Sequence, residues 1–77
     1  MKMKTDIRTA SQLAEFVRAE RKTQHVTQIQ LAQLANVGVR FVRDIEDGKP
    51  SLHFEKLLRV LNTLGIAVTL SSATGGE

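Results

Sequence analysis

Apolar residues recur at helical spacing near the start of the chain. They are three or four positions apart, which places them on one side of a helix. These residues are Ala10, Leu13, Phe16 and Val17. Thr9 precedes them and Gln12 follows three residues later, which is the T-x-x-Q pattern of a capping box. The pattern predicts a helix that begins after Thr9 and ends near Lys22.

Residues 27–50 predict two short helices joined by a tight turn. Thr27 and Gln30 form a second capping box at the start of the first of these helices. Asn36 stands where a sharp turn after a helix needs one left-handed residue. Gly38 then serves as the N-cap of the next helix, more weakly than serine would.

The end of the second short helix carries its own signals. Gly48 supplies a C-terminal stop and Pro50 blocks any continuation, so the helix is expected to end at about Asp47. The core residues expected from the two short helices and their turn are Leu31, Ala32, Ala35, Val37, Val42 and Ile45.

The last third of the chain predicts one more helix and a strand. Ser51 is the expected cap of a helix that runs to about Leu64, just before Gly65. Apolar residues cover more than one face of this helix, whereas a surface helix shows a single stripe of roughly 100°. We therefore expect a second packing surface to bury the remaining apolar face of this helix. Residues 66–70, IAVTL, alternate between large and small side chains and are rich in β-branched residues. This pattern is typical of a strand.

A lone strand at 66–70 needs a hydrogen-bond partner. The candidates are residues 3–7, the same strand of a second subunit, and a sheet edge on another protein. The last helix also has more apolar residues than one buried face needs. A symmetric dimer is the simplest arrangement that both pairs the strand and buries these residues. The residues expected at the dimer interface are Leu61, Leu64, Ile66, Val68 and Leu70. The predicted organisation is an arm (1–8), a domain of short helices that contains the two-helix segment (9–65), a dimerisation strand (66–70) and a disordered tail (71–77).

Positive charge is concentrated at the start of the chain. Of the net +3 over 77 residues, residues 1–26 carry the whole surplus and the rest is neutral. A basic balance favours nucleic-acid binding. Without cysteine there is no disulfide framework or thiolate metal site, and no apolar run approaches the ~18 residues of a membrane span. A cytoplasmic protein without a membrane partner is expected. It has no catalytic triad, HExxH motif or glycine-rich phosphate loop, so neither an enzyme nor a cofactor or metal site is expected.

The segment 27–48, TQIQLAQLANVGVRFVRDIEDG, resembles the XRE/Cro/phage-repressor family of helix-turn-helix domains. The residues that match at the family's spacing are Thr27, Gln28, Leu31, Ala32, Ala35, Val37, Ile45, Glu46 and Gly48. The family favours glycine at Asn36, and Ser or Thr at Gly38, where the difference removes a possible phosphate contact. The resemblance implies an all-α, lambda-repressor-like fold of four to five short helices, with the second short helix in the DNA major groove.

The polar face of that recognition helix carries the residues expected to read bases. Arg40 and Arg43 are the first candidates, because arginine can donate two hydrogen bonds to guanine. The alternative is intrahelical ion pairing with Asp44 and Asp47, which contributes at most a few tenths of a kcal/mol. Val39 matches a base-contacting position of the family and suits a thymine methyl group. Asp44 is expected either to accept from cytosine or to orient Arg40.

Residues expected to contact phosphate flank the recognition helix. Thr27 and Gln28 stand at a helix N-terminus, where a side-chain amide and free backbone N–H groups suit a phosphate. Gly38 and Lys49 are lesser candidates at the two ends of the recognition helix.

The family resemblance also implies an ion pair between helices. In the family a basic residue of the first helix pairs with the acidic residue before the final glycine of the recognition helix. Those positions are Arg21 and Glu46 here. The pair locks the two helices together and turns the arginine toward a phosphate; the alternative is two exposed charges that never meet.

The last third narrows the resemblance to the HipB-type antitoxins of HipA/HipB toxin–antitoxin modules. PSLHFEKLLRVLNTLGIAVTL after the repressor-type motif is similar to those small dimers, in which a C-terminal strand pairs across the two-fold axis. The resemblance implies an antitoxin and autorepressor that binds an inverted-repeat operator and neutralises a HipA-type serine/threonine kinase toxin. Two alternatives stay open: a solitary repressor, and an adaptor that no longer reads DNA, which the near-neutral recognition helix favours.

Overall fold

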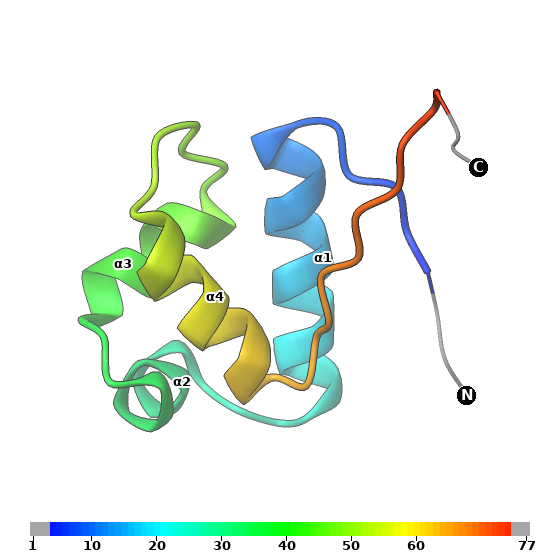
Figure 1. Ribbon diagram of the computed structural model, residues 1–77. Helices are drawn as coiled ribbons and strands as arrows, with labels where there is room; N and C mark the ends of the chain where they lie inside the picture. Colours follow the sequence, from blue (N-terminus) through cyan, green and yellow to red (C-terminus); the bar gives the residue numbers. More distant parts are fainter. Residues whose placement is uncertain (1–3, 75–77) are drawn as a thin grey trace.

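The computed structural model describes residues 4–74 and contains four helices in that part of the chain. They are α1 (Ala10–Thr23), α2 (Gln28–Ala35), α3 (Val39–Glu46) and α4 (Phe54–Thr63). α3 packs against both α1 and α2, and α4 packs against α2 (Figure 1). The predicted all-α architecture of four to five short helices is therefore confirmed.

Both predicted capping boxes are formed. The Oγ1 atoms of Thr9 and Thr27 accept hydrogen bonds from the backbone N–H groups of Gln12 and Gln30, at 3.1 and 3.0 Å. Each glutamine side chain in turn accepts from the backbone N–H of its capping threonine. An N-cap of this kind is worth about 1 kcal/mol, so the capping boxes set where α1 and α2 begin.

The ends of α3, the predicted recognition helix, also follow the prediction. Asn36 has a φ of 58°, in the left-handed region, and turns the chain between α2 and α3. Gly38 is the N-cap of α3 and makes no side-chain cap, as a glycine must. After α3 ends at Glu46, Gly48 reverses the chain with a φ of 78°.

The start of α4 differs from the prediction. His53, and not Ser51, is the N-cap, and its Nδ1 atom accepts a hydrogen bond from the Lys56 backbone N–H at 3.3 Å. Leu52 packs against the core from a non-helical segment, so the helix begins only at Phe54.

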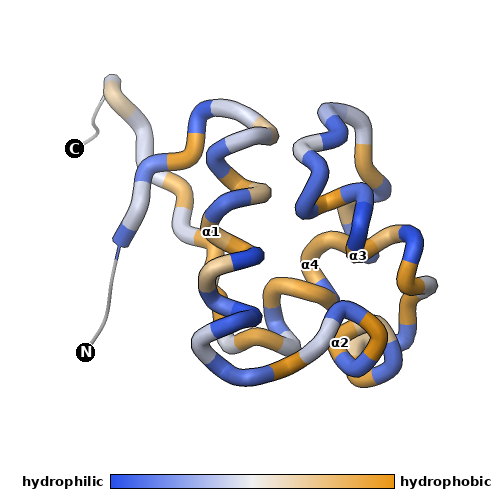
Figure 2. The backbone as a smooth tube through the Cα atoms, turned by 180° about the vertical axis from the view of Figure 1, so that it is seen from behind, coloured by the Kyte–Doolittle hydropathy of each residue, from blue (hydrophilic) through white to orange (hydrophobic). Residues whose placement is uncertain are grey.

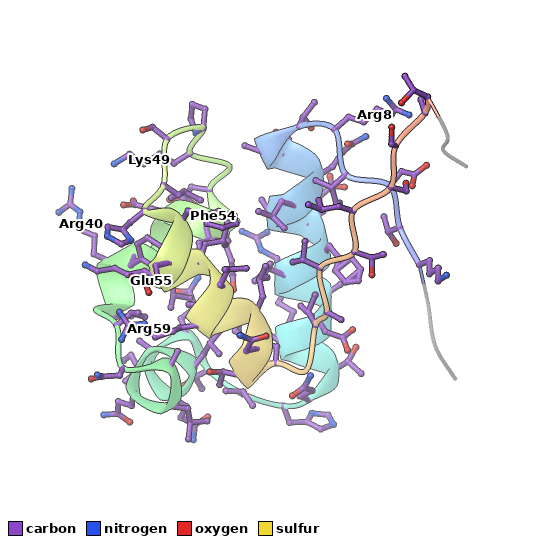
Figure 3. The ribbon with its side chains drawn as sticks, viewed as in Figure 1. Arg8, Arg40, Lys49, Phe54, Glu55 and Arg59 are labelled. Carbon is purple, nitrogen blue, oxygen red and sulfur yellow. The ribbon has the colours of Figure 1, made fainter. Side chains whose placement is uncertain are left out.

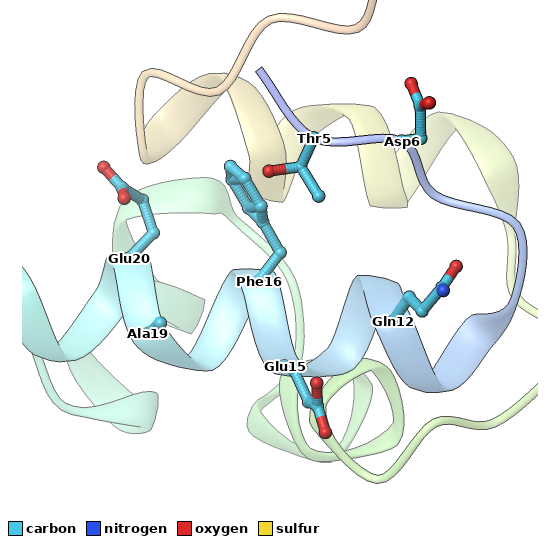
Figure 4. A pocket seen from close by; sticks show the side chains of 7 residues that line it. All are labelled: Thr5, Asp6, Gln12, Glu15, Phe16, Ala19 and Glu20. Atoms are coloured by element: carbon cyan, nitrogen blue, oxygen red, sulfur yellow. The ribbon is translucent and has the colours of Figure 1, made fainter. Parts of the chain in front are cut away.

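The core is built from all four helices and the residue that follows α4. Its members are Val17, Leu31, Ala32, Ala35, Val42, Ile45, Val60, Leu61 and Leu64. Five of the six core residues predicted for the helix-turn-helix segment are buried, and Val37 packs at the edge of the cluster. The hydrophobic stretches of α2 and α4 come together within the bundle (Figure 2). On α1 the buried side is centred on Ala14 and Val17, while Phe16 is half-buried and points toward the N-terminal arm (Figure 4).

Two residues predicted for the dimer interface lie instead inside the single chain. Leu61 and Leu64 are only 3% and 4% exposed. The segment that follows α4 buries part of the remaining apolar face of that helix. The backbone N–H of Ile66 donates to the Leu61 carbonyl at 2.8 Å, and the Ile66 side chain packs on the core. The assignment of Leu61 and Leu64 to the dimer surface is therefore wrong.

Residues 66–70 form no strand in the single chain. They run as coil on the outer side of α1, the same side as the arm at residues 4–8, and neither segment is paired into a ladder (Figure 1). Val68 and Leu70 are 54% and 91% exposed, so this segment presents unpaired apolar side chains. Its pairing across a dimer stays a prediction.

The structure describes only part of each end of the chain. Residues 71–74 of the predicted disordered tail include a turn, in which the backbone N–H of Thr74 donates to Ser72 Oγ at 3.2 Å. Residues 1–3 of the arm and 75–77 of the tail lie outside the described residues. No helix within 4–74 is long and apolar enough to cross a lipid bilayer.

Candidate nucleic-acid interface

One buried carboxylate joins the three helices α1, α2 and α3. The Glu46 side chain, at the end of α3, is 0% exposed. Its Oε2 accepts from Arg21 Nε of α1 at 2.7 Å, and its Oε1 accepts from Arg21 Nη2 at 2.9 Å and from Gln28 Nε2 of α2 at 3.0 Å. The ion pair predicted between Arg21 and Glu46 is thus present, in the fork-to-fork geometry that is strongest for arginine and carboxylate.

The surroundings of Glu46 keep it ionised. Burial by itself raises the pKa of Glu46, but hydrogen bonds from Arg21 and Gln28, with the charges of Arg21 and Arg18, outweigh burial and hold the pKa below its ordinary value. The hydrogen bond to Glu46 likewise raises the pKa of Arg21, against the opposing effect of burial. The pair therefore stays charged throughout the physiological range.

Arg21 has little capacity left for a phosphate. Its third nitrogen, Nη1, donates to the Val26 carbonyl at 2.9 Å, and its side chain is only 11% exposed. Arg18, one helical turn earlier, is 52% exposed and lies 3.7 Å from Glu46. Sequence reasoning overlooked Arg18, although its i−3 spacing from Arg21 places both on one side of α1. Of the two arginines beside Glu46, Arg18 is the more accessible.

The exposed face of α3 carries the arginines predicted to read bases. Arg40 and Arg43 are exposed, whereas Val39 and Asp44 are half-buried and Val39 packs partly against the core. Arg40 projects outward from α3, on the same side of the molecule as Lys49 (Figure 3). The nearest cation to Asp44 is Lys49, at 3.6 Å, and not Arg40. This partly exposed pair, between α3 and the following loop, leaves the Arg40 side chain free to reach outward.

The N-terminus of α2 lies beside the C-terminal end of α3, because Gln28 donates a hydrogen bond to Glu46 there. Thr27 Oγ1 caps its own helix, while Gln28 is half-buried, with its amide held at the junction of the helices. Gly38 is exposed, and a methyl group added to its Cα would meet no atom within 4 Å. The predicted phosphate-contacting residues Thr27, Gln28, Gly38 and Lys49 therefore all belong to α2, α3 or the segments next to them.

Another contact holds the turn of the motif and was not expected. Arg59 of α4 donates from Nη1 to the backbone carbonyl of Asn36 at 3.3 Å. The left-handed turn residue is therefore tied to α4, which helps to fix the angle between α2 and α3. No sequence motif signalled this contact, because it joins residues 23 positions apart.

The opposite side of α1 has a different character. A shallow hollow between the arm and α1 is lined by Asp6, Glu15 and Glu20 among other residues, and by no basic side chain of residues 4–74 (Figure 4). Such a surface repels phosphate. Within residues 4–74 no group of three or more His, Cys, Asp or Glu side chains could hold a metal ion.

A short helix, a tight turn and a second helix with outward arginines define a helix-turn-helix DNA-binding transcriptional regulator. The family model described as Helix-turn-helix matches residues 17–70, and the chain belongs to that family. An HTH-type transcriptional regulator of Sinorhizobium fredii, y4mF, is 42% identical over 64 residues, covering 83% of this chain and 84% of that protein.

Solved structures share the fold at lower identity. HipB in the HipA–HipB–O2–O3 complex has a TM-score of 0.82 at 20% identity, over 91% of this chain and 99% of that chain. HipB in the HipB–O4 20mer complex has a TM-score of 0.82 at 21% identity, with the same coverage. A restriction–modification controller protein has a TM-score of 0.68 at 21% identity, over 82% of this chain and 80% of its own. These likenesses establish the XRE-like repressor fold.

Proposed function

We propose that this protein is a dimeric, operator-binding antitoxin that represses its own operon and neutralises a HipA-like serine/threonine kinase toxin. The observation that supports the proposal is the extent of the fold shared with HipB, which covers 91% of this chain and 99% of that chain. This function places the protein in the cytoplasm, together with the DNA it binds.

The proposed base-reading surface is the exposed face of α3. Arg40 and Arg43 donate to guanine, and each good bidentate contact is worth roughly 1–3 kcal/mol of discrimination. Val39 offers the exposed part of its side chain to a thymine methyl group, and Asp44, held by Lys49, accepts from cytosine.

The proposed phosphate contacts surround that face. Gln28 and Thr27 at the start of α2, Gly38 before α3 and Lys49 after it meet the DNA backbone. The role first assigned to Arg21 passes mainly to Arg18, because Arg21 is engaged by Glu46 and Val26 while Arg18 is half exposed.

The proposed dimer contact is the segment at 66–70. Ile66 anchors it to the core, and Val68 and Leu70 present exposed apolar side chains to a second copy. Strand pairing across a two-fold axis would satisfy the backbone groups that the single chain leaves unpaired. Two α3 helices would then enter successive major grooves about 34 Å apart, which requires an inverted-repeat operator.

The DNA-binding part of the proposal is tested by comparing three alanine variants. Arg40→Ala should remove roughly 1–3 kcal/mol of preference for the operator over scrambled DNA. Gln28→Ala should weaken both duplexes by similar factors, since a phosphate contact carries no sequence information. Arg8→Ala is the charge-matched control, on the far side of the molecule from Arg40 (Figure 3). Equal losses on both duplexes for Arg40→Ala would remove Arg40 as a base reader.

The antitoxin part is tested separately by a tagged pull-down from the native host, with mass spectrometry of the recovered proteins. A stoichiometric kinase-like partner supports the antitoxin. Recovery of the dimer alone, while the neighbouring genes are expressed, supports a solitary transcriptional repressor. The observation in favour of that second candidate is the 42% identical relative, whose name records transcriptional regulation only.

A further inference from the structure

The buried Glu46 carboxylate holds a residue that the proposed function places on the DNA backbone. With its side chain 0% exposed, Glu46 cannot itself touch a ligand. Its Oε1 atom nevertheless accepts from Gln28 Nε2 at 3.0 Å, so a group in the interior of the domain fixes a group at its surface.

The chemistry of the two groups determines how the amide is oriented. An ionised carboxylate only accepts hydrogen bonds, so the Gln28 amide must turn its nitrogen toward Glu46. The nitrogen carries two N–H groups and Glu46 takes one of them. Within residues 4–74 no further hydrogen bond engages the other N–H, which lies at the first residue of α2, where the backbone N–H groups also point out of the helix.

We propose that Glu46 is a positioning residue for DNA binding: it presets the Gln28 side chain so that its remaining N–H meets a phosphate without a loss of rotamer freedom. This inference rests on the proposed DNA contact of Gln28. Immobilising a long polar side chain weakens association, so loss of the presetting should lower DNA affinity roughly three- to tenfold. Arg21 has a different task, because it balances the charge of Glu46 and ties α1 to α3.

Electrostatics alone predicts the opposite change in DNA affinity, so the experiment can distinguish the two explanations. Glu46→Gln removes one negative charge near DNA and, by electrostatics only, should tighten binding. Asp47→Asn is the matched control, since Asp47 is the next residue, exposed, and has no contact with Gln28 among the hydrogen bonds and ion pairs of residues 4–74. We expect Asp47→Asn to bind as tightly as the wild type or more tightly.

The test is a double-mutant cycle, with the duplex obtained by in vitro selection from a random library and a scrambled duplex as probes. Glu46→Gln should weaken binding roughly three- to tenfold in the wild type and less than about twofold in the Gln28→Ala background. An equal loss in both backgrounds shows that Glu46 acts only through the stability of the domain, and overturns the inference. A wild-type protein that does not prefer the selected duplex refutes the proposed function instead.

A measurement on the wild type covers the case in which Glu46→Gln does not fold. Side-chain ¹⁵N relaxation should show the Gln28 amide to be rigid in the free protein. Gln33, exposed on the same helix, is the internal reference. A Gln28 amide as mobile as that of Gln33 would contradict the inference.

Discussion

Arg21→Ala should be among the most destabilising single substitutions in this domain. The change leaves the Glu46 carboxylate buried, at 0% side-chain exposure, without the arginine that donates two hydrogen bonds to it. Breaking a buried pair by removing one partner costs about 3–5 kcal/mol. A chain of 77 residues has a total free energy of unfolding of roughly 4–12 kcal/mol. The variant should therefore be close to unfolding at pH 7.

The same substitution should reverse the pH dependence of stability. In the wild type the pKa of Glu46 is lowered from 4.5, so its contribution is present above the unfolded pKa and is lost as pH falls through the folded value. Without Arg21, burial dominates and raises the pKa of Glu46. Stability of the variant should then increase as pH falls from 7 toward 4.5, whereas in the wild type the stabilising contribution of Glu46 is lost only as pH falls below 4.5.

Urea denaturation followed by circular dichroism, at one fixed protein concentration and several pH values, measures both effects. Arg18→Ala is the matched control: it removes the same charge beside the same carboxylate, but from a side chain 52% exposed at 3.7 Å, and should cost about 0–1 kcal/mol. If Arg21→Ala were no more destabilising than Arg18→Ala at pH 7, the structural role assigned to the pair would be wrong.

Three further predictions concern the core, the turn and the dimer. Ile45→Ala should destabilise the domain by about 2–5 kcal/mol in urea, whereas Ile29→Ala, 55% exposed, should stay within about 0.5 kcal/mol; similar effects at both sites would contradict the core assignment. Asn36→Ala should cost about 1–2 kcal/mol because Asn36 is left-handed at φ 58°, whereas Asn36→Gly should not; equal thermal shifts for the two would remove that explanation. Leu70→Asp should shift sedimentation toward the monomer, whereas Leu34→Asp, also exposed at 69%, should not; an unchanged dimer in Leu70→Asp would exclude the C-terminal segment from the interface.

Local chemistry explains why the helix boundaries were predictable. Capping threonines, the left-handed Asn36 and the stop at Gly48 act within a few residues of themselves, so their effects can be recognised in sequence. The same reasoning from neighbouring residues wrongly predicted Ser51 as the N-cap of α4. There the packing of Leu52 on the distant core decided where α4 begins.

The candidate site was predictable in its residues and less so in its contacts. The outward side of Arg40 and Arg43 follows from helical periodicity, and the Arg21–Glu46 pair from the family pattern. The bond from Gln28 to Glu46 and that from Arg59 to Asn36 depend on how three helices meet, which no spacing in the sequence records.

The surplus of apolar residues at the C-terminus was open to two interpretations. A hydrophobic pattern shows that a face must be covered, but it does not show whether the cover lies in the same chain. In the structure Leu61 and Leu64 are buried within their own domain. In the C-terminal segment, Val68 and Leu70 are the large apolar side chains that stay exposed.

The proposed DNA reading by α3 depends on a symmetric dimer. The most direct test is in vitro selection of duplexes from a random library by the purified protein, followed by binding of the enriched duplex at several salt concentrations. We expect an inverted repeat with half-sites centred about 10 base pairs apart, and an affinity that falls steeply with salt. A library that yields no enriched sequence, with weak binding that salt does not change, would contradict it.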